Sequence, residues 1–111
     1  MELTQAHYDL LRAIESLQGD DSERFPSTPD VGARLLEIYK ARGGVYSWHS
    51  SAPWHGTSPM ADELRREGLI EVDVGIATFH HPSQPAASVD QYWIGITGEG
   101  RIALAKVKSG E

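Results

Sequence analysis

The spacing of apolar residues changes near residue 70, from a helical period to an alternation of two. Apolar side chains recur every three or four positions in residues 3–17 and again in residues 31–39, which predicts two amphipathic helices. Thr4 is placed to cap the first helix, and Thr28 with the proline after it marks the start of the second. Each stretch is followed by glycine, which suits the end of a helix.

Residues 57–71, TSPMADELRREGLIE, predict a short helix that leads directly into a strand. Thr57 and Ser58 are suited to an N-cap, and the proline after them fits a first helical turn. Gly68 can take the left-handed conformation that ends a helix, and the apolar run after it begins the strand. We expect the rest of the chain to pack on this unit.

Two alternating runs predict an antiparallel pair of strands. Isoleucine and valine alternate with Glu, Asp and Gly in residues 70–76, and the same period returns in residues 92–96. The connection, residues 77–90, contains two prolines, an alanine pair and serines. We therefore expect a flexible excursion there, the wing of a hairpin.

A last helical stretch begins after Thr97, which is placed to cap it. With 111 residues and 40% hydrophobic residues, the chain has material for one core and one domain. We place that domain at residues 1–108 and a disordered tail at residues 109–111. The residues of this helix expected to fold back on the first one are Ile102, Leu104 and Ala105.

Composition limits the function in a few ways. No run of about 18 apolar residues is long enough to cross a bilayer, and the N-terminus does not have the pattern of a signal peptide, so we expect a cytoplasmic protein. The absence of cysteine excludes disulfides, thiol catalysis and thiolate metal sites. His49 and His55 are badly spaced for two ligands on one helix, and we expect neither a metal nor a cofactor.

The net charge of -6 is concentrated near the N-terminus, where residues 1–30 carry seven acids. Asp20, Asp21 and Glu23 could form a metal loop, but we favour a solvated loop in which Phe25 turns back onto the core. The second helix has a more basic exposed face, and its Arg34 could touch phosphates or simply be solvated.

Two segments read together, ELRREGLIEV and YWIGITGEGRIALA, resemble bacterial winged-helix transcriptional regulators of the MarR-like and PadR-like groups. The first matches a helix that enters the wing, and the second matches a strand that leaves it. The matching residues are Leu64, Gly68, Leu69 and Ile70 in the first segment, and Ile96, Thr97, Gly100 and Arg101 in the second. The resemblance implies an α+β winged helix-turn-helix with helices first, then a two-stranded antiparallel wing and a short C-terminal helix.

The resemblance also implies that the third helix enters the major groove of double-stranded DNA while the wing reaches the backbone or minor groove. By this analogy four residues of the third helix and its cap face outward: Ser58, Asp62, Arg65 and Arg66. Thr57 would help to hold a phosphate, and Arg34, His80 and His81 complete the expected DNA-binding set. Any homodimer would use the first and last helices, because no longer arm follows the wing.

A second hypothesis is an acidic winged-helix module that binds a protein partner instead of DNA. The wing contains no lysine or arginine, and Trp48, Trp54 and Phe79 could serve as aromatic anchors, although one tryptophan is expected in the core. An enzyme is not favoured, because the adjacent His80 and His81 point to different sides of a loop and no glycine-rich phosphate loop follows a strand.

Overall fold

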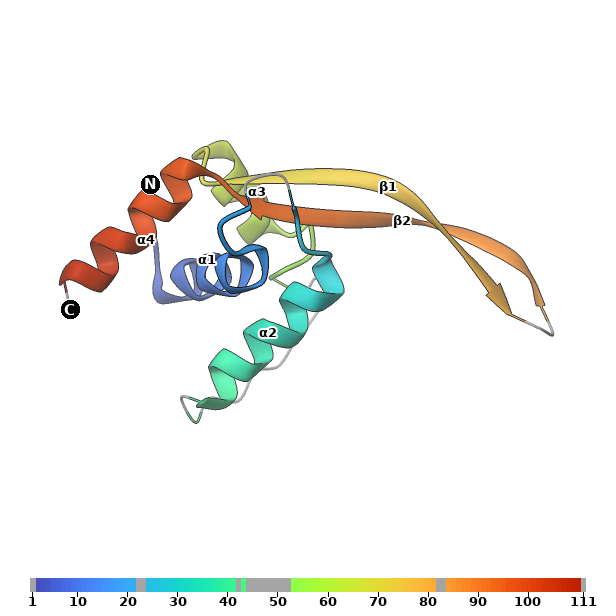
Figure 1. Cartoon of the computed structure of the whole chain (residues 1–111), viewed down its shortest axis with the longest axis horizontal. Helices are drawn as coiled ribbons and strands as arrows, with labels where there is room; N and C mark the ends of the chain where they lie inside the picture. The colour runs from blue at the N-terminus through green and yellow to red at the C-terminus, as the bar shows by residue number, and fades with distance from the viewer. Residues whose placement is uncertain (1, 22–23, 42, 44–52, 82–83, 111) are drawn as a thin grey trace.

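A group of helices carries one long hairpin that extends well beyond them (Figure 1). The computed structural model describes residues 2–21, 24–41, 43, 53–81 and 84–110, without the side chains of 77–89 and 108–110. The described residues extend over 54 × 31 × 24 Å, and the hairpin gives the molecule its long axis (Figure 1).

The described part is a small α+β domain with helices on both sides of the hairpin in sequence. The elements in order are α1 (Gln5–Gln18), α2 (Thr28–Ala41), α3 (Pro59–Arg66), β1 (Ile70–His81), β2 (Gln84–Ile96) and α4 (Gly98–Gly110). The four predicted helix starts are confirmed, at Thr4, Thr28, Ser58 and Thr97. Helix α4 extends to Gly110, beyond the expected end of the domain at residue 108.

The core is centred on α1, and the prediction that the chain packs on residues 57–71 is wrong in this respect. Helix α1 lies beside α2, α4 and β2, whereas α3 contributes two side chains to the core. A short helix has one narrow apolar face and can cover less surface than the longer α1. The buried apolar residues are Leu10, Leu11, Ala13, Ile14, Val31, Leu35, Tyr39, Ala61, Leu64, Ile70, Ile94, Ile96 and Leu104.

The two strands pair antiparallel along their whole length. Ile70 lies opposite Ile96 and Val74 opposite Tyr92, so the predicted pairing of 70–76 with 92–96 is confirmed. The prediction of a flexible excursion at 77–90 is wrong, because the ladder continues through Thr78 and Ser88. Pro85 does not prevent this, since a two-stranded ribbon has unpaired edges on which a proline is tolerated.

The segment before α2 forms an edge of this sheet. Ser27 makes an isolated bridge with Trp93, and the Ile94 amide donates to the Pro26 carbonyl at 2.9 Å. The Phe25 ring turns back against Gly95 of β2, but Phe25 is not among the described residues that pack against the core, so the prediction that it reaches the core is met only in part. A side chain at position 95 would occupy the space of this ring.

Helix α4 presents a different face to α1 than its sequence pattern predicts. Leu104 is fully buried, but Ile102 is 57% exposed and Ala105 is also exposed, so the expectation that those two fold onto α1 is wrong. Arg101 fixes the orientation of the helix, because its Nη2 donates to the Gly19 carbonyl at the end of α1 at 2.5 Å. This bond places Leu104, one turn later, over the core.

One joint connects α3, the base of the hairpin and α4. Gly68 has φ of 75°, as predicted, and the Leu69 amide donates back to the Leu64 carbonyl at 3.0 Å. The Thr97 amide donates to the Leu69 carbonyl at 3.1 Å, and the Thr97 hydroxyl donates to the Gly68 carbonyl at 2.6 Å. Thr97 also caps α4 as predicted, by accepting from the Gly100 amide at 3.0 Å.

Candidate nucleic-acid interface

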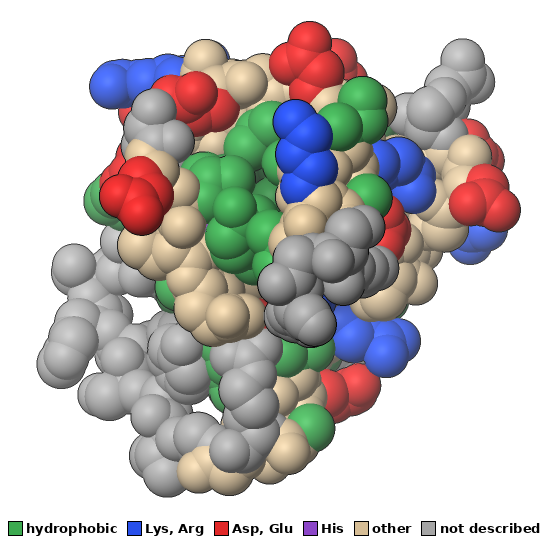
Figure 2. Space-filling model, turned by 90° about the vertical axis from the view of Figure 1, so that its left-hand side faces the viewer, with side chains coloured by type: hydrophobic (Ala, Val, Ile, Leu, Met, Phe, Trp, Pro, Cys, Tyr) green, Lys and Arg blue, Asp and Glu red, His purple; other side chains and the backbone are tan. Residues whose placement is uncertain are grey.

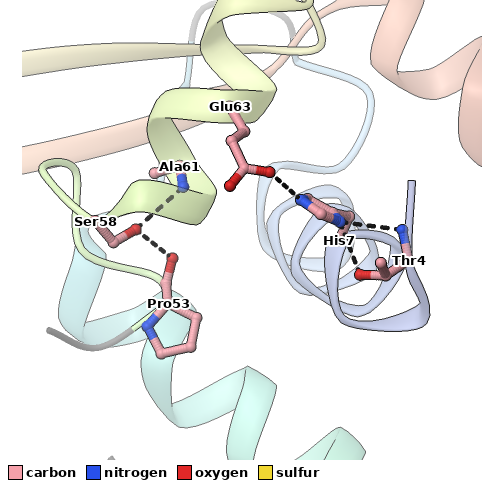
Figure 3. Close-up of polar contacts among 6 residues, drawn as sticks. All are labelled: Thr4, His7, Pro53, Ser58, Ala61 and Glu63. Atoms are coloured by element: carbon pink, nitrogen blue, oxygen red, sulfur yellow. Dashed lines mark hydrogen bonds and ion pairs between the residues drawn. The ribbon is translucent and has the colours of Figure 1, made fainter. Parts of the chain in front are cut away.

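The start of α3 is fixed by Ser58, which is buried and does not face outward as the resemblance implied. Its Oγ accepts from the Ala61 amide at 3.1 Å and donates to the Pro53 carbonyl at 2.8 Å (Figure 3). Ser58 is 1% exposed because it joins the helix to the segment that leads into it. The hydroxyl is therefore an N-cap and is already engaged on both sides.

The N-terminus of α3 offers few donors to a phosphate. The Ala61 and Asp62 amides both bond to Ser58, and Pro59 has no amide hydrogen. Thr57 is exposed, but its hydroxyl lies 2.9 Å from His55 Nδ1, and the His55 ring packs on Tyr92 with 5.0 Å between centroids. The cap residues thus serve the local fold, and the outer face of the helix remains for a ligand.

That outer face carries two arginines held by one carboxylate. Asp62 Oδ1 lies 2.6 Å from Arg65 Nη2, and Asp62 Oδ2 lies 2.9 Å from Arg66 Nε. The arginine side chains are 54% and 75% exposed. The hydrogen bond from Arg65 lowers the pKa of Asp62, and the charge of Arg66 acts in the same direction. Asp62 therefore stays ionised and orients both guanidinium groups.

Glu63 has a structural role that the sequence reading missed. Its Oε2 lies 3.0 Å from Nε2 of the buried His7, whose Nδ1 accepts from the Thr4 amide at 3.0 Å (Figure 3). Since Nδ1 is an acceptor, the ring hydrogen belongs on Nε2, which donates to Glu63. This contact attaches α3 to the first turn of α1. A histidine three residues after the Thr4 cap was the available signal, because that position commonly bonds back to the cap.

The hairpin side of α3 is acidic. Arg65 lines a cleft of about 560 Å³ together with Glu71 and Asp73 of β1 and Thr97 at the end of β2. The sequence has no lysine or arginine between Arg66 and Arg101. Arg65 therefore lies beside negative charge, to which the hairpin adds no lysine or arginine.

The other predicted DNA-binding residues do not join the arginines of α3. Arg34 of α2 lines a separate cleft with Arg12 and Arg101, away from the residues of α3. His80 and His81 end β1, far along the hairpin, and their side chains, like that of Phe79, lie outside the described residues. Arg65, Arg66 and Asp62 are thus the part of the predicted set that the fold brings together.

Of the aromatic residues proposed as partner anchors, Trp54 is the one whose side chain the structure describes. Trp54 is half-buried, and its indole lies against Gly32 of α2, where an added Cβ would be 2.5 Å from the ring. This contact gives Trp54 a packing role between α2 and the segment before α3. Trp48 and His49 lie outside the described residues.

Comparison with protein-family models, curated proteins and solved structures found no match to this chain. Among the described helices, none has the length and apolar character needed to cross a membrane. In the same part of the chain, no three carboxylate or imidazole side chains gather as a metal-binding group.

Proposed function

We propose that this protein is a DNA-binding transcriptional regulator that contacts double-stranded DNA through α3. The observation that carries the proposal is the pair Arg65 and Arg66, which project from the exposed face of a short helix whose opposite face is buried. Three helices followed by an antiparallel hairpin is also the element order of a winged helix-turn-helix. The resemblance of the sequence to MarR-like and PadR-like regulators supports the same reading.

Asp62 sets how the arginines meet DNA. A phosphate or a guanine edge must either displace this carboxylate or bind the guanidinium N–H groups that the carboxylate does not use. Arginine has several donors in a planar fork, so one side can hold Asp62 while another contacts DNA. Affinity is therefore modest, and it favours sites where both guanidinium groups find an acceptor.

A gel-shift assay with fragments of genomic DNA at two salt concentrations tests the proposal. The wild-type protein should retard a subset of fragments, and the Arg65→Ala/Arg66→Ala variant should lose this binding. If each arginine neutralises one phosphate, the slope of log affinity against log salt falls by about two. The matched control is Arg24→Ala/Lys40→Ala, which removes two exposed positive charges outside α3.

Unchanged affinity of the α3 variant would overturn the assignment. Loss of binding in both variants would mean that total charge, and not the face of α3, governs it. A circular dichroism spectrum of each variant shows that the fold is retained, because all four substituted side chains are exposed.

A second candidate function, binding of a protein partner, is favoured by the hairpin itself. Val74 and Ile76 are 62% and 76% exposed on the strand face that carries the buried Ile70 nearer the helices. Two acids lie close by in the ladder: Asp73 precedes Val74 in β1, and Asp90 of β2 lies opposite Ile76. The hairpin contains no lysine or arginine. Exposed apolar side chains in an acidic setting are typical of a surface that binds protein, since DNA would be repelled.

The two functions are distinguished by what the protein recovers from a native extract, DNA or a protein partner. The Val74→Thr/Ile76→Thr variant should lose a protein partner and keep DNA, whereas Trp54→Ala tests the anchor proposed from sequence. Recovery of DNA without protein by the wild type would count against the second candidate. Recovery of protein without DNA would count against the first.

A homodimer through the first and last helices is part of the proposal. Figure 2 shows hydrophobic side chains gathered on the face at the α4 end of the molecule, with Lys and Arg side chains beside them. A cleft of about 360 Å³ lies on this side between α1 and α4. Its lining is Tyr8, Leu69, Glu99, Ile102, Ala103 and Lys106.

A further inference from the structure

A cleft of about 350 Å³ lies where the segment before α2 pairs with β2. Two aromatic rings line it, Phe25 from that segment and Trp93 from β2, and Leu17 of α1 adds an apolar wall. The volume is near the lower end of the range of small-molecule sites, which is about 300–1,000 Å³. A ligand of this cleft is therefore small and presents an apolar side to the rings.

Both rings are held in place by glycines of the hairpin. The Phe25 ring lies against Gly95, and the Trp93 ring lies over Gly75, where an added Cβ would be 2.8 Å from the ring. The two backbones are also joined, because Ser27 forms a bridge with Trp93. Half-buried rings on a fixed backbone offer an apolar surface that needs little ordering when a ligand binds.

The cleft also carries one positive and one negative side chain, Arg24 and Asp30. Both are exposed, and among the described residues neither side chain forms an ion pair or hydrogen bond, either with the other or with a third group. Each of the other described arginines pairs with an acid. Arg24 and Asp30 thus share one cleft without neutralising each other, and both remain available to a ligand.

We infer that this cleft binds a free amino acid with an aromatic or other large apolar side chain. The carboxylate of the ligand binds the Arg24 guanidinium, its ammonium group binds the Asp30 carboxylate, and its side chain packs on Phe25 and Trp93. An ion of one sign would be attracted by one of the two charged residues and repelled by the other, so the zwitterion is favoured. None of the residues that line the cleft belongs to α3, and the inference does not depend on DNA binding.

The test uses four ligands that share the benzyl side chain of phenylalanine and differ in charge. They are L-phenylalanine with both charges, its amide with the positive charge alone, its N-acetyl form with the negative charge alone, and the neutral N-acetyl amide. Each is titrated into the whole chain, and the chemical shifts of the backbone amides and of the Trp93 indole report affinity and location. We expect L-phenylalanine to shift the signals of residues 24–30 and of Trp93. It should bind about tenfold more tightly than either singly charged form, because each of those loses one charge-assisted hydrogen bond.

The variants Arg24→Gln and Asp30→Asn test the two charges separately. Arg24→Gln should bind L-phenylalanine no better than the amide, without losing affinity for the amide. Asp30→Asn should bind L-phenylalanine no better than the N-acetyl form, without losing affinity for that form. A loss restricted to one ligand in this way cannot come from unfolding. The controls are Lys40→Gln and Glu37→Gln, which change exposed charges of α2 outside the cleft and should bind L-phenylalanine as the wild type does.

Four results would each overturn the inference. The first two are no binding of L-phenylalanine to the wild type and shifts confined to residues outside the cleft. The third is binding of the neutral N-acetyl amide as tight as that of L-phenylalanine, which would show that the cleft recognises the ring or a peptide and not the zwitterion. The fourth is an equal loss of affinity for all four ligands in both variants, which would show that neither charge acts on its own part of the ligand.

Discussion

At the scale of single residues, Asp62 controls the charge of the candidate interface. The Asp62→Asn substitution removes a negative charge beside Arg65 and Arg66 and releases both guanidinium groups. We expect DNA affinity to rise severalfold, up to about tenfold, at low salt, because more phosphate contacts become available. Fluorescence anisotropy with a labelled fragment measures the change.

Glu37→Gln is the matched control, since it removes the acid next to Arg34 on α2 and changes the net charge equally. An equal gain from both variants would show a general charge effect and would contradict the role of Asp62. The pKa of Asp62 is lowered, so any stability from its ion pairs is present above the usual Asp range and is lost as the pH falls through the lowered value. Asp62 is therefore ionised at both about pH 6 and pH 8. The difference in DNA affinity between wild type and Asp62→Asn should be the same at these two pH values.

Gly68 tests the joint at the end of α3. Its φ of 75° is strained for any residue with a side chain, so Gly68→Ala should lower the free energy of unfolding by about 1 kcal/mol. The melting temperature should fall by about 4–8 °C in a domain of this size. Gly98→Ala is the control, because a Cβ there meets open space and the backbone does not need glycine. Equal melting temperatures for the two variants would contradict the role of Gly68.

At the scale of elements, the outer hairpin is expected to be dispensable for folding. A variant in which Asn-Gly joins Ile76 directly to Asp90 keeps the register, because these two residues face each other. The core residues of the sheet, Ile70, Ile94 and Ile96, remain in place. We expect the melting temperature to stay within about 4 °C of wild type, equivalent to about 1 kcal/mol.

The same variant sorts the two candidate functions. Binding of DNA through α3 should persist, whereas a protein that docks on the outer hairpin should be lost. A large fall in melting temperature would instead show that the outer strands support the core, contrary to their position in the fold.

The elements that the sequence predicted well are those set by local chemistry. Thr4, Ser58, Gly68 and Thr97 act within one turn of their own position, so their roles can be read from neighbouring residues. The length of the hairpin was missed because prolines and small residues are typical of turns, and pairing with the opposite strand outweighs that preference.

The candidate site was predicted in part for a related reason. Arg65 and Arg66 lie three and four positions after Asp62, and this spacing alone predicts that both can reach its carboxylate. Arg34, by contrast, belongs to a cleft formed by three helices, and Glu63 meets His7 across 56 positions of sequence. Contacts between distant segments leave no periodic signal in one sequence. The burial of Ser58 depends on a local bond, to the Pro53 carbonyl five residues earlier, which helical periodicity does not report either.

At the scale of the whole molecule, the exposed side of α4 predicts self-association. Ile102 is 57% exposed beside the cleft between α1 and α4, and a homodimer would cover it. Light scattering after size exclusion should give twice the monomer mass for the wild type at high concentration and the monomer mass for Ile102→Glu. Ile76→Glu changes a still more exposed isoleucine on the hairpin and should remain dimeric. A wild type that stays monomeric, or a dimer lost in the Ile76 variant, would contradict this interface.

The joint around Leu69 and Thr97 also has a mechanical consequence. Three hydrogen bonds of 2.6–3.1 Å fasten the last turn of α3, the root of both strands and the cap of α4 within a few residues. Gly100 is pressed so closely against the Leu69 carbonyl that a methyl group would not fit. The root of the hairpin is thus fastened to α3 and α4 at the same point, so a force on the hairpin is transmitted to both helices together.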